Sequence, residues 1–81
     1  MHTSLLDEMA SGTSAVMFFS AKTYYDYDQI IDYCTFHRMY FHSDVRNKNV
    51  YVFTRTQALK VANYIVSAHI DAVPVNILKD W

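Results

Sequence analysis

The residues with the most reactive side chains lie near the middle of the chain, where the sequence reads Cys34-x2-His37-x4-His42. Three ligands of this kind can begin a zinc site, but no CxxC pair or fourth ligand accompanies them. Cys34 and His37 also stand at helical spacing, as a nucleophile and a base would. However, Cys34 falls on an apolar helical stripe, where a lone cysteine is usually a packing residue. We therefore predict no metal site, no cofactor and no catalytic residue.

The motifs of common enzyme classes are also missing from the sequence. There is no glycine-rich phosphate loop, no nucleophile elbow and no HExxH motif. Asp26, Asp28 and Asp32 share one predicted helix, where they suit a helix cap and a solvated face better than an acid–base pair. A single glycine, Gly12, leaves little material for an active-site loop. We therefore expect a protein that is not an enzyme.

The aromatic residues of a predicted hairpin carry the main functional expectation. Strands are predicted at Met39–His42 and Val50–Thr54, joined by a polar turn in which Asn tolerates left-handed backbone angles. Alternation turns Val50 and Val52 toward the helices and the aromatic residues toward the opposite face of the sheet. The candidate partner-binding residues on that opposite face are Tyr40, His42, Tyr51 and Phe53. An exposed apolar patch of this kind usually marks a binding site.

The first predicted strand, Thr13–Ala21, adds further apolar side chains to the same face. Its centre is a continuous apolar run, which suits a central strand covered on one face and partly on the other. Because such a run has no alternation, two pairs of residues remain candidates for the helix-free face. They are Met17 with Phe19, or Val16 with Phe18.

Two interpretations of the aromatic residues remain open. In the first they bind another protein, because Tyr and Phe are favoured at protein interfaces. In the second they stack the bases of single-stranded RNA or DNA, because segment 48–53 resembles the second motif of RNA-recognition domains, without its glycine. Arg46 and Lys48 would form a charged rim in either case. The net charge of −1 favours a protein partner over a nucleic acid.

The size and composition of the chain indicate one domain, residues 1–81, in the cytoplasm. The single cysteine cannot form an internal disulfide, and the first residues carry acids where a signal peptide needs an apolar run. No segment approaches the ~20 apolar residues that a membrane span needs. Between Arg38 and Lys60 there are five bases and one acid. This basic region suits an acidic partner or, more simply, a solvated hairpin with ordinary compensation of helix ends.

Capping residues and apolar spacing predict the remaining elements. A short helix is expected at Leu5–Ser11, a second helix after the cap Thr23 with His37 and Arg38 in its last turn, and a third after the cap Thr54. The apolar stripe expected on the third helix consists of Ala58, Leu59, Val61, Ala62, Ile65, Val66 and His69. A last strand is expected at Ala72–Leu78, at a sheet edge because Pro74 lacks an N–H group. We find no internal repeat in the sequence.

The element order predicts an α+β fold, a ferredoxin-like βαββαβ sandwich. This fold is a four-stranded antiparallel sheet with two helices on one face, and the short N-terminal helix would be an addition to it. The order places the last strand at an edge, as Pro74 independently requires. The alternative is a less regular α/β sandwich in which the N-terminal helix packs across the sheet.

In general character the chain resembles the small accessory proteins of bacteriophages, which are short, single-domain, rich in Tyr and Phe, and free of catalytic motifs. The resemblance is carried by size and composition and transfers no residue roles. It implies a protein that binds a host protein and inhibits or modulates it. The sequence therefore predicts a non-enzymatic protein-binding module, which also forms a homodimer, and single-stranded nucleic-acid binding is the alternative.

Overall fold

Residues 15–77 are described by the computed structural model, and they form four strands and two helices. The elements are β1 (Met17–Ala21), α2 (Tyr24–Phe36), β2 (Phe41–Asp44), β3 (Asn49–Val52), α3 (Arg55–Ser67) and β4 (Ala72–Asn76). The predicted order of these six elements is confirmed. The predicted helix at Leu5–Ser11 lies outside the described residues.

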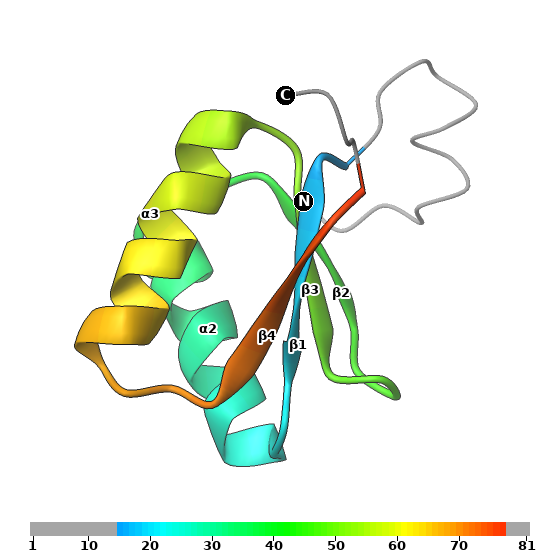
Figure 1. Ribbon diagram of the computed structural model, residues 1–81, viewed down its shortest axis with the longest axis vertical. Coiled ribbons are helices and arrows are strands. Elements are labelled where there is room, and N and C mark those ends of the chain that lie inside the picture. Colours follow the sequence, from blue (N-terminus) through cyan, green and yellow to red (C-terminus); the bar gives the residue numbers. More distant parts are fainter. Residues whose placement is uncertain (1–14, 78–81) are drawn as a thin grey trace.

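The four strands form one antiparallel sheet in the order β2-β3-β1-β4. Both helices lie on the same face of this sheet, as Figure 1 shows, and the other face carries neither of them. The α+β class is thus confirmed, and the arrangement is consistent with the predicted ferredoxin-like topology.

The hydrophobic core lies between the sheet and the two helices. Phe19 on β1 is opposite Val50 on β3, and both side chains are fully buried. The helices add the buried residues Tyr27, Ile30 and Cys34 from α2 and Ala58, Val61 and Ile65 from α3. All six lie at apolar positions that helical spacing predicts. Leu59 and Val66 depart from the prediction, because they are 64 % and 75 % exposed.

Both helices begin at the predicted threonine caps. The backbone N–H of Asp26 donates to the side chain of Thr23, and that of Gln57 donates to the side chain of Thr54, each over 3.1 Å. Each bond satisfies a backbone donor that the first helical turn would otherwise leave unpaired. The caps therefore fix where each helix leaves its preceding strand.

Both helices also end in the same way, and here the prediction was wrong in detail. His37 and Arg38 were expected in the last turn of α2 and His69 on α3, but all three lie just beyond the helices. Arg38 and His69 have a φ of 56° in each case. The next residue donates its N–H back into the helix, from Met39 to the carbonyl of Cys34 and from Ile70 to that of Ile65. This is the Schellman arrangement, in which a glycine normally occupies the left-handed position.

The matching caps show that the fold contains a structural repeat that no sequence pattern revealed. Thr23 and Thr54 are 31 positions apart, and the same interval separates Arg38 from His69. The strand–helix–strand unit β1-α2-β2 is therefore followed by an equivalent unit, β3-α3-β4. The two units share backbone geometry and differ in nearly every side chain.

The position of Pro74 on the edge strand β4 is confirmed. The N–H of Lys22 donates to the carbonyl of Asp71, and the N–H of Ile77 donates to that of Val16. Because hydrogen-bonded pairs alternate along an antiparallel ladder, these bonds place the N–H position of residue 74 on the outer side of β4. Proline at that position costs no ladder bond and removes a donor from the free edge.

Candidate functional site: the aromatic face of the sheet

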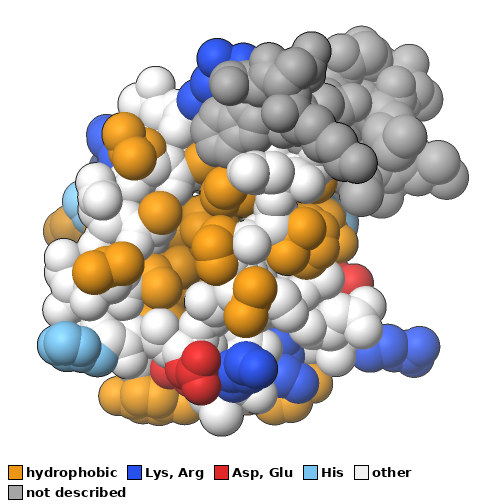
Figure 2. Space-filling model, viewed as in Figure 1, with side chains coloured by type: hydrophobic (Ala, Val, Ile, Leu, Met, Phe, Trp, Pro, Cys, Tyr) orange, Lys and Arg blue, Asp and Glu red, His pale blue; other side chains and the backbone are white. Residues whose placement is uncertain are grey.

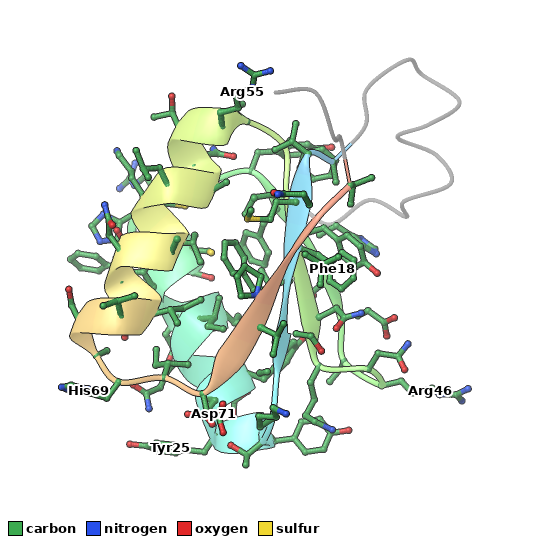
Figure 3. All side chains as sticks on the ribbon, viewed as in Figure 1. Phe18, Tyr25, Arg46, Arg55, His69 and Asp71 are labelled. Carbon is green, nitrogen blue, oxygen red and sulfur yellow. The ribbon has the colours of Figure 1, made fainter. Side chains whose placement is uncertain are left out.

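Three aromatic rings from three adjacent strands lie side by side on the helix-free face of the sheet. Phe18 of β1 and His42 of β2 are both register partners of Tyr51 on β3. The ring centroids are 5.0 Å apart for Phe18 and Tyr51, and 5.6 Å apart for His42 and Tyr51. Figure 3 shows Phe18 on the side of the sheet opposite the helices. All three side chains are half-buried, so they are packed on one another and still reach the surface.

A second aromatic pair continues this cluster beyond the ends of the hairpin strands. The rings of Tyr40 and Phe53 have centroids 4.8 Å apart. Tyr40 is half-buried, but Phe53 is only 9 % exposed, in contrast to the exposed position expected for it. Phe53 therefore packs against Tyr40 and offers little surface of its own. We call Phe18, Tyr40, His42, Tyr51 and Phe53 the aromatic face.

The structure decides between the two pairs of β1 residues that the sequence left open. Phe19 points into the core and is fully buried, which places Phe18 on the aromatic face. Val16, the other residue of the predicted pair, is buried in the core and is not part of this face. Sequence reasoning could not select Phe18, because the apolar run of β1 has no alternation. The available signal was indirect: a residue opposite the buried Val50 must itself face the helices.

The polar residues of the hairpin order the aromatic face at its turn end. The side-chain amide of Asn49 donates to the Tyr51 hydroxyl over 3.4 Å. In the turn, Asn47 donates its backbone N–H and its side-chain amide to the Asp44 carboxylate, over 3.3 and 2.7 Å. The hydrogen bond from the Asn47 side chain lowers the pKa of Asp44. The Asp44 carboxylate thus accepts two hydrogen bonds from Asn47, and these bonds hold the turn in shape.

The predicted charged rim is divided between two sides of the molecule. Lys48 takes the left-handed backbone conformation of the turn, with φ of 58°, where the sequence had indicated an asparagine. Its Nζ lies 4.8 Å from the centroid of the Tyr24 ring at the start of α2, on the helix side of the sheet. Arg46 is exposed at the tip of the hairpin, as Figure 3 shows. Arg46 alone therefore extends freely beyond the aromatic face.

Cys34 lies in the core of the fold, away from solvent. Its side chain is fully buried in the core, and burial raises the pKa of the thiol to about 12. The reactive thiolate is thus suppressed at neutral pH. His37, the proposed base, is exposed and contacts the Tyr33 ring, with centroids 4.1 Å apart. Within residues 15–77 no three His, Cys, Asp or Glu side chains come together as metal ligands, and no pocket is found.

Comparison with known proteins gives no match, whether to a protein-family model, to a curated protein or to a solved structure. Neither of the two described helices is long and apolar enough to cross a membrane. Interpretation of the site therefore rests on the geometry and chemistry of its own residues.

Proposed function

We propose that this protein is a non-enzymatic protein-binding module, and that its aromatic face docks on a host protein that it inhibits or modulates. The observation that carries the proposal is the cluster of Phe18, His42 and Tyr51 on three adjacent strands of a sheet face without helices. Clustered aromatic side chains of this kind commonly supply the energetic centre of a protein interface. The inhibitory or modulating role is supported by the general resemblance to phage accessory proteins alone.

The charges on the aromatic side of the sheet favour a protein partner over a nucleic acid. By register, eight strand residues point to this side: Phe18, Ser20, His42, Asp44, Asn49, Tyr51, Val73 and Val75. None of these eight is Lys or Arg, and one is an acid. A protein that binds a phosphate backbone replaces counterions with basic side chains, and these positions provide none. An apolar and aromatic patch on a partner protein fits them better.

The test compares two tyrosine variants in affinity capture from a lysate of the host, followed by titration of the purified captured protein. Tyr51→Ala removes the centre of the aromatic face, whereas Tyr25→Ala removes a 74 % exposed tyrosine from α2 and serves as the matched control. We expect Tyr51→Ala to weaken binding at least roughly tenfold, as loss of a central anchor does. Tyr25→Ala should bind like the wild type.

Circular dichroism melting of both variants separates a lost contact from a lost fold. The proposal fails if a folded Tyr51→Ala variant binds the captured protein as tightly as the wild type. It also fails if Tyr25→Ala and Tyr51→Ala weaken binding equally, because the aromatic face would then have no special part.

One observation favours the second candidate, single-stranded nucleic-acid binding. Phe18 and Tyr51 lie on the two central strands of the sheet with ring centroids 5.0 Å apart, and RNA-recognition domains stack bases on aromatic residues of the corresponding strands. A titration with a mixed-sequence oligonucleotide at low and moderate salt tests it. Binding that falls steeply with salt and is lost in Tyr51→Ala would support this candidate, and absence of binding at low salt would remove it.

A further inference from the structure

His42 has a buried ring nitrogen without a hydrogen-bond partner on the aromatic face. Its ring packs beside that of Tyr51, with centroids 5.6 Å apart. The Nδ1 atom is shielded from solvent, and in the part of the chain that the structure describes it has no hydrogen-bond partner. Buried polar atoms in folded proteins nearly always have one. The unpaired Nδ1 therefore points to a second arrangement of this side chain, in which the atom is satisfied.

The observed position of His42 suits the neutral ring better than the charged ring. A neutral imidazole has one N–H group, and with the proton on Nε2 the buried Nδ1 is an acceptor that lacks a donor. The imidazolium has an N–H group on both nitrogens, so Nδ1 would become a charged donor buried without an acceptor. This state costs more, because the burial of a charge adds to the missing hydrogen bond. A ring that takes up a proton is therefore driven out of this position.

Asp44 offers the charged ring an acceptor two residues further along β2. Residues two apart on a strand point to the same face, so both side chains lie on the helix-free side. The Asp44 carboxylate accepts two hydrogen bonds from Asn47 and has lone pairs for a further one. The pKa of Asp44 is lowered first by the hydrogen bond from the Asn47 side chain, and the charge of His42 lowers it further. The two groups are therefore near enough to attract each other.

The other groups of β2, β3 and the hairpin turn attract a charged ring less than Asp44 does. On the side of His42, the described titratable or charged residues of these segments are Tyr40, Asp44, Tyr51 and Arg46. The tyrosine hydroxyls are neutral, and Arg46 at the hairpin tip repels a cation. Lys48 lies on the helix side, over the ring of Tyr24.

β1 and β4 bring no charge close to His42. Their strand residues on this side of the sheet are Phe18, Ser20, Val73 and Val75. Figure 2 shows mainly hydrophobic and uncharged side chains along the middle of β4, with charged ones gathered near its lower end. Lys22 follows β1 and Asp71 precedes β4, and these strands lie two and three places away from β2 in the sheet. A proton on His42 would thus bring a new charge to the aromatic face.

We propose that His42 is a pH-sensitive switch of the aromatic face. At pH 8 the neutral ring packs beside Tyr51, as the structure shows. Between pH 8 and pH 5, where histidine side chains take up a proton, the ring leaves this position and its Nδ1–H donates to the Asp44 carboxylate. The move uncovers part of the Tyr51 ring and places an ion pair beside it. The aromatic face is therefore apolar at neutral pH and more polar in mild acid.

NMR spectroscopy of the labelled full chain between pH 8 and pH 5 tests the switch without any partner. The ring nitrogens of His42 report its protonation, and nuclear Overhauser effects between the rings of His42 and Tyr51 report their contact. We expect Nδ1 to carry no proton at pH 8 and the contact to be lost as the ring takes up its proton, with an unchanged circular dichroism spectrum. A ring that takes up the proton and keeps the contact, or that stays neutral down to pH 5, overturns the proposal.

Two matched variants test the part of Asp44. Asp44→Asn removes the carboxylate charge and keeps an oxygen that can accept from the turn. In this variant the loss of contact should move to lower pH by roughly one unit, because a nearby opposite charge no longer favours the charged ring. Asp32→Asn removes the same charge from an exposed position on α2 and should behave like the wild type. An unchanged transition in Asp44→Asn, or an equal shift in both variants, overturns the role of Asp44.

The consequence for binding rests on the proposed function. A protein that docks an apolar surface on Tyr51 should bind roughly tenfold more weakly at pH 5.5 than at pH 7.5, because docking would then bury a charge. The probe is the protein captured from the host lysate, titrated against the wild type and His42→Phe. The affinity of His42→Phe should be the same at both pH values, since phenylalanine does not titrate. Equal pH dependence in both proteins overturns this regulation, whereas undiminished binding by Tyr51→Ala at pH 7.5 counts against the proposed function alone.

Discussion

The two strand–helix–strand units of this fold have the same order of elements, but their edge strands, β2 and β4, are buried to different extents. In the first unit, the edge strand β2 buries Phe41 against the helices, and its remaining residues are half-buried. In the second unit, the corresponding strand β4 has Ala72 at the equivalent position and exposes residues 73–76. Equal topology thus leaves one edge of the sheet packed and the other open. Side-chain volume at a few edge positions, and not strand order, decides how closely each edge strand is packed.

The largest expected effect comes from truncating Phe41, the buried side chain of the edge strand β2. Phe41→Ala should lower the free energy of unfolding by about 3–5 kcal/mol, because a large core side chain is lost and a cavity remains. Val75→Ala on β4 should change it by less than about 1 kcal/mol, because much of that side chain is already in water. Urea denaturation of both variants measures the contrast. Similar losses for the two variants would show that β4 is packed as well as β2.

The second expected effect concerns Cys34, which occupies in α2 the position that Ile65 occupies in α3. Burial raises the pKa of its thiol from the usual 9.0 to about 12. The folded state therefore holds this proton more tightly than the unfolded state, so the stabilisation is complete below pH 9 and declines as the pH rises toward 12. Over that interval we expect a loss of about 1.4 kcal/mol per pH unit from this group.

Tyrosine and lysine residues titrate in the same range, so the measurement is a difference between two proteins. Urea denaturation of the wild type and of Cys34→Ala between pH 8 and pH 11 should give curves that converge as the pH rises. Parallel curves across this interval would mean that the thiol is not desolvated. Ile65, at the equivalent position of α3, should give the free energy of unfolding no such pH dependence, because isoleucine does not titrate.

The sequence sufficed for the parts of the fold that local chemistry determines. Threonine caps, alternation in the hairpin and the edge position of Pro74 each follow from one residue type in one local setting. Spacing alone predicts a buried stripe of Tyr27, Ile30, Ile31 and Cys34 on α2, of which Ile31 is half-buried and the other three are buried. These features are decided within one helix or one strand, which is why they could be read without the rest of the chain.

The candidate site was only partly predictable, because it depends on contacts between distant segments. His42 and Tyr51 were found from alternation, but Phe18 needed the pairing of β1 with β3. Phe53 was placed on the correct strand and assigned too much exposure. Lys48 is adjacent in sequence to the aromatic face, yet its Nζ lies over the ring of Tyr24 on α2. No local pattern reports such a contact.

The exposed stripe of α3 is a second case in which the sequence alone could not separate core residues from surface residues. Leu59 and Val66 are apolar at helical spacing, so sequence reasoning counted them as core. A wide stripe does not reveal which part of it the sheet covers. In this fold the sheet and α2 cover Val61 and Ile65, while the flank nearest β4 stays open. Both misassigned residues, Leu59 and Val66, are exposed on α3.

The smallest expected effect concerns the left-handed residues that follow both helices. Arg38 and His69 occupy equivalent left-handed positions after α2 and α3, a conformation that costs a non-glycine residue roughly 1 kcal/mol. Arg38→Gly and His69→Gly should each raise the free energy of unfolding by about 0.5–1 kcal/mol, and by similar amounts, because the caps have the same hydrogen bonds. Lys60→Gly, inside α3, should lower it by about 1 kcal/mol. Urea denaturation distinguishes these signs. If Arg38→Gly raised the free energy of unfolding and His69→Gly did not, the cap after α3 would contribute less to stability than the cap after α2.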